Sequence, residues 1–160
     1  MNDAPPDPLA QALGRIPSGL FLVTTERDGA PLGFLGSFVM QVGFDPPTVC
    51  VAVAEGREHL AAMRESGRFT LSVVDAGSSA VMGPFFKPRE DGGSPYDDLA
   101  HHPAPSGLAV LSDTLAWLDC KVSGEHAVGD HVVVFGEVLA GGILHAGDPT
   151  VHLRQDGLSY

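Results

Sequence analysis

The stretch Gly33–His59, GFLGSFVMQVGFDPPTVCVAVAEGREH, has the pattern of two strands that are separated by a proline corner and followed by a turn into a helix. Gly33, Gly36 and Gly43 interrupt the first strand, and such glycines are typical of a β-bulge or of a close approach to the backbone. Two interpretations follow. Either a flat ligand lies along this strand, or the glycines mark a bulged core strand of a small barrel, which the glycines alone favour.

Short strands joined by turns are predicted on both sides of this stretch. The hairpin signal Arg27-Asp28-Gly29 joins a strand at residues 19–26 to a second strand at residues 31–44, which ends at the prolines because they remove ladder donors. The other predicted elements are strands at residues 48–54, 68–74, 115–128, 131–140 and 150–154, helices at residues 9–17, 59–66 and 78–86, and a polar loop after residue 86 that we interpret as a lid or an interface loop. We expect the first helix to cap a barrel end.

Composition indicates one β-rich domain. The 160 residues include 20 Gly and 13 Pro, which suits many short strands and turns better than long helices. Strands do not alternate with long helices, so a doubly wound sheet is disfavoured. We predict a disordered tail at residues 1–8 and a single domain at residues 9–160.

The charge balance limits the class of partner. With 9 Lys and Arg against 20 Asp and Glu, the net charge is -11, which excludes nucleic acid and anionic membrane surfaces as expected partners. An anionic cofactor would need backbone N–H groups and a few arginines. No signal peptide or membrane-spanning segment is evident, so we expect a cytoplasmic protein whose Cys50 and Cys120 are reduced and buried.

The common catalytic motifs are absent from this sequence. There is no GxGxxG after a strand, no Walker loop, no GxSxG elbow and no HExxH. His101 and His102 lie in the acidic loop, where adjacent side chains on an extended chain point apart, so a solvated loop is favoured over a metal site.

Five segments, taken in chain order, resemble the short-chain flavin reductase family of FMN-binding split barrels. They are the quoted stretch, GRFTLSVV, LAWLDCKV, GDHVVVFGEV and the terminal HLRQDGLSY. The resemblance covers Leu9–Tyr160 and is greatest to the flavin reductase domain of diflavin flavoproteins, because Gln41 and the corner 44–47 match that branch. It implies a mainly β Greek-key split barrel with a few short helices, and a homodimer that binds FMN, or alternatively FAD, near the subunit interface.

The resemblance also implies an activity, in which NADH or NADPH reduces the flavin and the reduced flavin passes to an oxygenase, another flavin-accepting partner or oxygen. The backbone of Leu35, Gly36, Ser37 and Phe38 would lie against the flavin ring, where N–H groups stabilise charge on reduction. Ser37 would donate to the flavin or else satisfy a barrel bulge. The long amide of Gln41, in an apolar strand, needs partners and is a further flavin-binding candidate.

The remaining candidate residues concern phosphate and nicotinamide. Arg57 and His59 stand at the start of a helix, which attracts an anion, and Lys87 is placed to reach a phosphate or to lie free in solvent. By resemblance, His131 of the GDH segment positions the nicotinamide, and Tyr160 covers the flavin or caps the partner subunit.

The sequence departs from the family at two positions, where Phe34 and Gly36 replace a Thr and an Asn that would hydrogen bond the ring. An alternative function therefore stays open, that of an FMN-binding electron-transfer module without its own nicotinamide oxidation. A pyridoxamine phosphate oxidase of related fold is a third option, but it would need a more basic pocket than nine cations suggest.

Overall fold

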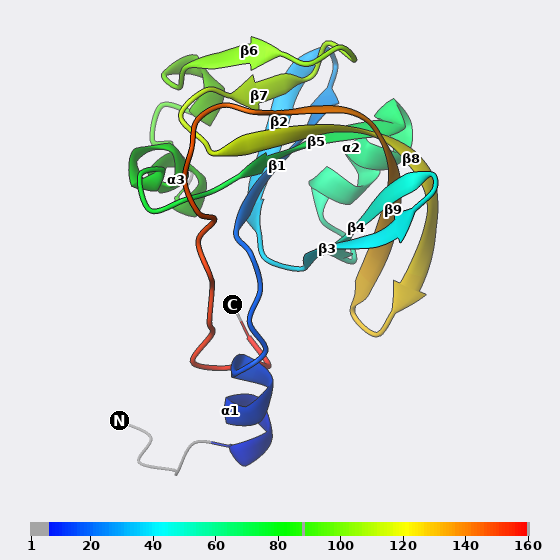
Figure 1. The fold of residues 1–160 in the computed structure, drawn as a ribbon, viewed down its shortest axis with the longest axis vertical. Helices are drawn as coiled ribbons and strands as arrows, with labels where there is room; N and C mark the ends of the chain where they lie inside the picture. The colour runs from blue at the N-terminus through cyan, green and yellow to red at the C-terminus, as the bar shows by residue number, and fades with distance from the viewer. Residues whose placement is uncertain (1–6, 88, 160) are drawn as a thin grey trace.

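The computed structural model describes residues 7–87 and 89–159 of the chain. Figure 1 shows a strongly curved sheet with short helices at its periphery and one helix, α1, standing apart from it. The helices are α1 (Pro8–Gly14), α2 (Glu58–Ser66), α3 (Ser79–Phe86) and the 3-10 helix η1 (Pro95–Asp97). The strands are β1 (Phe21–Arg27), β2 (Ala30–Gly36), β3 (Val39–Phe44), β4 (Pro47–Ala54), β5 (Arg68–Val73), β6 (His101–Pro103), β7 (Ala109–Leu111), β8 (Ala116–Val128) and β9 (His131–Ile143).

Seven strands form one antiparallel sheet in the order β2-β1-β5-β8-β9-β4-β3. The predicted single strand at residues 31–44 is wrong, because the chain changes partners at Ser37 and Phe38. Before this point β2 pairs with β1, and after it β3 pairs with β4. Since β2 and β3 lie at opposite ends of the strand order but only two residues apart in the chain, the sheet curls until its ends approach each other.

Local turn chemistry behaves as the sequence predicts. Arg27 pairs with Ala30, and Asp28 and Gly29 between them have φ of 52° and 76°, the combination that a two-residue hairpin of the right twist requires. The ladder between β3 and β4 shifts register between Gln41 and Gly43, so the predicted bulge is confirmed at Gly43.

Other boundaries differ from the expectations. The loop after residue 86 contains η1 and the two-stranded sheet β6-β7, which are too short to have a readable periodicity. The predicted strand at residues 150–154 is reduced to one isolated bridge, between His152 and Ser18. Residues 7 and 8 are not part of a disordered tail, because Asp7 caps α1 by accepting from the N–H of Leu9 at 2.9 Å; residues 1–6 lie outside the described part of the chain.

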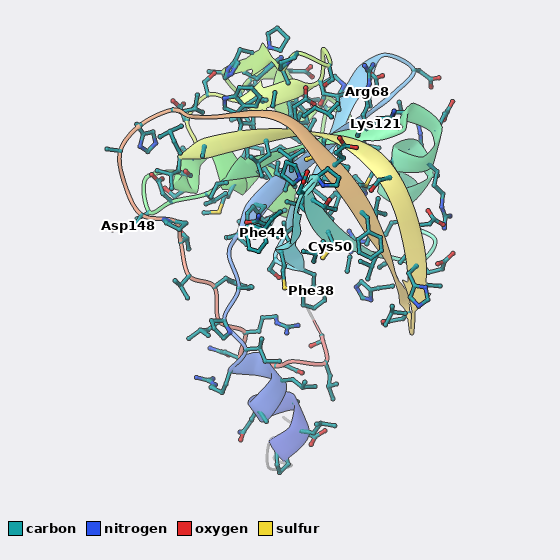
Figure 2. All side chains as sticks on the ribbon, turned by 45° about the vertical axis from the view of Figure 1, so that its right-hand side comes forward. Phe38, Phe44, Cys50, Arg68, Lys121 and Asp148 are labelled. Atoms are coloured by element: carbon teal, nitrogen blue, oxygen red, sulfur yellow. The ribbon has the colours of Figure 1, made fainter. Side chains whose placement is uncertain are left out.

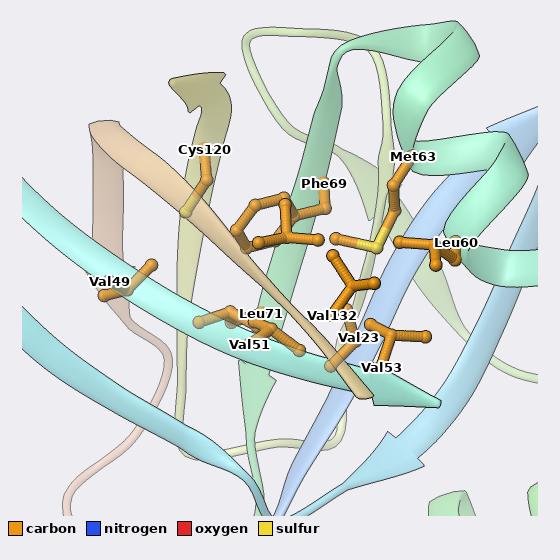
Figure 3. Close-up of a cluster of buried hydrophobic side chains, with 11 residues drawn as sticks. Val23, Val49, Val51, Val53, Leu60, Met63, Phe69, Leu71, Cys120 and Val132 are labelled. Atoms are coloured by element: carbon orange, nitrogen blue, oxygen red, sulfur yellow. The ribbon is translucent and has the colours of Figure 1, made fainter. Parts of the chain in front are cut away.

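The main core fills the inside of the curved sheet. Figure 3 shows side chains from β1, β4, β5, β8 and β9 in one cluster with Leu60 and Met63 of α2 at one side of it, so α2, and not α1, covers a barrel end. Burying one such side chain contributes about 1.5–3 kcal/mol. Cys120 belongs to this core and Cys50 is only half-buried, and both are free thiols, so burial of Cys50 was predicted incorrectly.

A second cluster anchors the long loop to the outside of β1 and β2. Tyr96 is 3% exposed, and its hydroxyl forms a 2.6 Å hydrogen bond with Oγ1 of the buried Thr24. A Cβ at Gly33 would lie 2.0 Å from this hydroxyl. The group that approaches the backbone at Gly33 is therefore the ring of Tyr96, and no ligand is needed to explain this glycine.

The two ends of the described chain form an arm, which we define as residues 8–19 and 151–159. Both segments leave the barrel at Val74, whose N–H donates to Leu20 O at 3.0 Å and whose carbonyl accepts from Thr150 N at 2.9 Å. In the arm, Ser18 and His152 exchange two backbone hydrogen bonds of 3.1 and 2.8 Å, and α1 packs against the C-terminal segment (Figure 1). The expectation that this helix caps the barrel is therefore wrong.

We predict that Gly33→Ala destabilises the protein by about 1–3 kcal/mol through overpacking against Tyr96. Tyr96→Phe removes the clashing oxygen but leaves Thr24 without its partner, at a cost of about 1–3 kcal/mol. The double variant should lose less unfolding free energy than the two single variants lose together, as measured by urea unfolding. Strictly additive losses would show that Tyr96 does not determine the need for glycine at this position.

Candidate functional site

A cavity of about 820 Å³ lies between the barrel, α3 and the arm. Its barrel wall comes from the end of β2, the link to β3 and the end of β4, and its opposite wall comes from the C-terminal segment of the arm. The apolar lining includes Phe34, Leu35, Phe38, Met82, Phe85 and Phe86. This size and lining suit a flat, largely apolar ligand with a few polar groups.

The barrel wall contains the predicted ring-binding segment. Leu35, Gly36, Ser37 and Phe38 all line the cavity, and Figure 2 shows Phe38 at the end of the barrel that faces the arm. Ser37 is 8% exposed and belongs to neither the β1–β2 nor the β3–β4 ladder. A backbone segment that has left its ladders can direct N–H groups at a ligand, which is what the ring-binding role needs.

Two arginines line the cavity from opposite walls, Arg57 at the N-cap of α2 and Arg154 in the arm. Among the described residues, neither side chain donates a hydrogen bond or pairs with a carboxylate, whereas four other arginines do pair: Arg27 with Glu58, Arg64 with Glu125, Arg68 with Glu26, and Arg89 with Asp91 and Asp98. In a chain of net charge -11, arginines left without carboxylates are notable. Their arrangement favours an anionic ligand in the cavity.

His59 does not line the cavity, although it follows Arg57 closely in the chain. Its Nε2–H donates to the carbonyl of Gly33 at 3.1 Å, and its ring meets the edge of Phe34 at a centroid distance of 5.0 Å. Nδ1 is buried and has no hydrogen-bond partner among the described residues. Burial lowers the pKa of His59, so the neutral ring supports the cavity wall from behind, and the structure offers no contact between it and a phosphate.

Three other candidates also lie away from the cavity. Gln41 is exposed on the edge strand β3, where its amide donates to Gly43 O at 3.1 Å, so its own bulge supplies its partner. Lys87 is exposed directly after α3. His131 stands behind Phe38, with ring centroids 5.7 Å apart, and hydrogen bonding from its Nδ1 lowers the pKa of Asp130.

Tyr160, the last predicted site residue, lies outside the described residues. The helix at residues 78–86 is predicted from the sequence, but its contribution of Met82 and Phe85 to the cavity is not, and neither is the arm wall with His152 and Arg154. Arg154 lies within the terminal HLRQDGLSY segment that resembles the family. The positive charge of Arg154 is the sequence signal that could indicate it, because a chain with only 9 Lys and Arg has few candidates for binding an anion.

A family profile described as "Flavin reductase like domain" matches residues 13–157 of the chain. The chain belongs to the flavin reductase family. Diflavin flavoprotein A 1 of Synechocystis sp. strain PCC 6803 is 32% identical over 154 residues, which are 95% of this chain and 27% of the relative. A protein named a probable flavin reductase, from Rhizobium meliloti strain 1021, is 30% identical over 84% of this chain and 43% of its own length. The chain thus spans about a quarter of the diflavin relative.

Solved structures agree with the split-barrel fold of the family. Nitrilotriacetate monooxygenase component B of Mycobacterium thermoresistibile superimposes with a TM-score of 0.83 at 26% identity, over 92% of this chain and 82% of that one. The styrene monooxygenase flavin reductase of Pseudomonas putida S12 superimposes with a TM-score of 0.79 at 25% identity, over 93% and 94% of the two chains. The predicted fold class is therefore confirmed. Within the described residues of the chain, no helix has the length and apolar character that crossing a membrane would require.

We predict that His59 makes folding stability pH-dependent. Its pKa is lowered in the folded state from an ordinary value of 6.5, so the unfolded chain takes up the proton first and stability falls as the pH drops below about 6.5. His59→Gln keeps a donor for Gly33 but does not titrate. Between about pH 7.5 and about pH 5.5 the variant should lose less unfolding free energy in urea than the wild type does, and equal losses would contradict the neutral, buried assignment.

Proposed function

We propose that this chain is an NAD(P)H-dependent flavin reductase that transfers hydride from a dihydronicotinamide to FMN in the cavity. The observation that carries the proposal is an apolar cavity of about 820 Å³ with an off-ladder backbone segment on one wall and two arginines without carboxylate partners. The names of the similar structures, a monooxygenase component and a monooxygenase flavin reductase, support the same reaction class.

The residues of the cavity fit a phosphorylated flavin. Its ring would lie against Leu35–Phe38, where Ser37 supplies polar groups. Its phosphate would be held by Arg57 and the first N–H groups of α2. A bound flavin supplies a ring system that accepts a hydride and a proton, two electrons in all. FAD is the alternative flavin, with its additional phosphate and adenosine extending beyond the same ring site.

His131 and Phe38 are proposed to position the nicotinamide. Hydride passes directly between rings, so no side chain has to carry the transferred hydrogen, and orientation is the contribution of the protein. His131 lies behind Phe38, so its effect on the nicotinamide passes through the Phe38 ring. It is a positioning residue in this arrangement.

A second candidate function is an FMN-binding electron-transfer module that does not oxidise nicotinamide. The observation that favours it is Phe34, which presents an apolar ring to the cavity where other members of the family would offer a hydroxyl. The reduced flavin or its electrons would then pass to a partner protein, such as an oxygenase, in both readings.

The first test is to load the purified protein with FMN under anaerobic conditions, add NADH or NADPH, and follow the absorbance of the oxidised flavin. We expect the absorbance to fall much faster than it does for free FMN. The nucleotide that reduces the flavin faster is the one that the protein prefers. If FMN binds and neither nucleotide bleaches it, the reductase proposal is wrong and the electron-transfer module takes its place.

We further propose that the protein is a homodimer in which β3 meets a second copy. As an edge strand, β3 leaves Met40, Val42 and Phe44 exposed at 62%, 43% and 90%, and an uncovered apolar edge of this kind promotes association. No nucleic acid or membrane partner is expected for so acidic a surface.

The dimer is tested by Phe44→Glu, which places a charge in the proposed interface. Light scattering after gel filtration should give twice 16.7 kDa for the wild type and 16.7 kDa for the variant. Ala30→Glu, in the exposed β1–β2 hairpin, adds the same charge elsewhere and should remain dimeric. A monomeric wild type, or a dimeric Phe44→Glu protein, would contradict this assignment.

A further inference from the structure

Arg154 forms no ion pair with another described residue, although its charge helps to lower the pKa of the nearby Asp156. Its side chain is half-buried on the arm wall of the cavity, with the guanidinium carbon 4.7 Å from the centroid of the Phe38 ring. Among the described residues, no carboxylate or carbonyl accepts a hydrogen bond from it. The nearby Asp156 is already engaged, because it accepts from Leu158 N at 2.7 Å and from Ser159 Oγ at 3.0 Å. The five N–H donors of the guanidinium therefore have no acceptor among the described residues.

The backbone of Arg154 is held in place by α1. A Cβ at Gly14 would lie 2.4 Å from the Arg154 carbonyl oxygen, so the helix end and this carbonyl are in direct contact. Two residues earlier, His152 is joined to Ser18 by two backbone hydrogen bonds. The main chain that carries Arg154 is thus packed against α1, and its guanidinium lies over the Phe38 ring.

The position of Arg154 separates it from Arg57. Arg57 belongs to the barrel wall at the start of α2, whereas Arg154 comes from the arm and lies on Phe38. The Phe38 ring also lies against the ring of His131, with the two centroids 5.7 Å apart. His131 is the residue that the proposed function assigns to the nicotinamide. A planar guanidinium matches phosphate oxygens in a bidentate way, and the summed field of a chain of net charge -11 otherwise disfavours a dinucleotide.

We propose that Arg154 binds the phosphates of the nicotinamide nucleotide, while Arg57 serves the flavin phosphate. The assignment rests on the proposed reductase function and adds a substrate-binding residue to it. Each anionic ligand then has its own arginine on its own wall of the cavity. It also gives the arm a role, since the arm presents the charge that admits the reductant.

The test compares Arg154→Gln with Arg15→Gln, both studied as full chains loaded with FMN. Arg15 is an exposed arginine of the arm at the C-cap of α1 and does not line the cavity, so it controls for loss of one positive charge. NADH is compared with 1-benzyl-1,4-dihydronicotinamide, a reductant without phosphates. Loss of a charge-assisted phosphate contact should raise the KM for NADH at least about tenfold in Arg154→Gln. The rate with the phosphate-free reductant, and both rates in Arg15→Gln, should be unchanged.

Binding supplies a readout that does not depend on turnover. The dissociation constant of NAD⁺, followed through the absorbance change of bound FMN, should rise about tenfold in Arg154→Gln. The affinities for FMN and for riboflavin should not change. Arg154→Lys keeps the charge but loses the planar fork, so its dissociation constant should lie between those of the wild type and Arg154→Gln.

Three results would overturn the assignment. Equal losses with NADH and the phosphate-free reductant would mean that Arg154 only shapes the cavity through Phe38. Weaker binding of FMN but not of riboflavin would mean that Arg154 holds the flavin phosphate. No difference between Arg154→Gln and Arg15→Gln would remove Arg154 from binding altogether. A wild-type protein that NADH and NADPH both fail to reduce would overturn the proposed function as well, and is recognised before any variant is made.

Discussion

The sheet must close at Ser37 and Phe38, and the site depends on that closure. β2 and β3 lie at opposite ends of the seven-strand order, yet only these two residues join them. A link of this length spans at most about 11 Å, so the two ends of the sheet are drawn together. The main chain at the link leaves its ladders, and Ala52 N donates to Phe38 O at 2.9 Å across the junction. A backbone segment with groups available to a ligand therefore results directly from barrel closure.

The second wall of the cavity has a different origin, because it is built from both ends of the chain. α1 and the C-terminal segment are held together by close main-chain contact: Gly157 N donates to Ala10 O at 2.8 Å, and a Cβ at Gly157 would lie 2.2 Å from the Cβ of Leu13. A side chain at Gly157 would force the two segments apart. The arm thus keeps its shape through backbone packing and offers its side chains, Arg154 among them, to the cavity.

Charge organises the surface around this cavity. Most arginines near the barrel are paired with carboxylates, and the exposed pairs Arg27–Glu58 and Arg64–Glu125 each contribute little to stability. The two cavity arginines are the ones available to a ligand. Within an acidic protein, Arg57 and Arg154 form a local cationic site in the cavity lining. This local arrangement reconciles a net charge of -11 with membership of a family that handles flavin and nicotinamide nucleotides.

The sequence by itself determined the fold class, most strand and helix positions, the Asp28-Gly29 hairpin and the bulge at Gly43, because these depend on local turn chemistry and on period-two patterns. It also identified the main-chain segment Leu35–Phe38 and Arg57, which all line the cavity. Only the tertiary structure decided that residues 31–44 form two strands, since a change of pairing partner leaves no local signal. It likewise decided that Gly33 accommodates Tyr96, that His59 Nε2 and the Gln41 amide donate to Gly33 and Gly43, and that Arg154 faces Phe38. These contacts join residues distant in the chain or depend on side-chain direction, which no spacing within the sequence encodes.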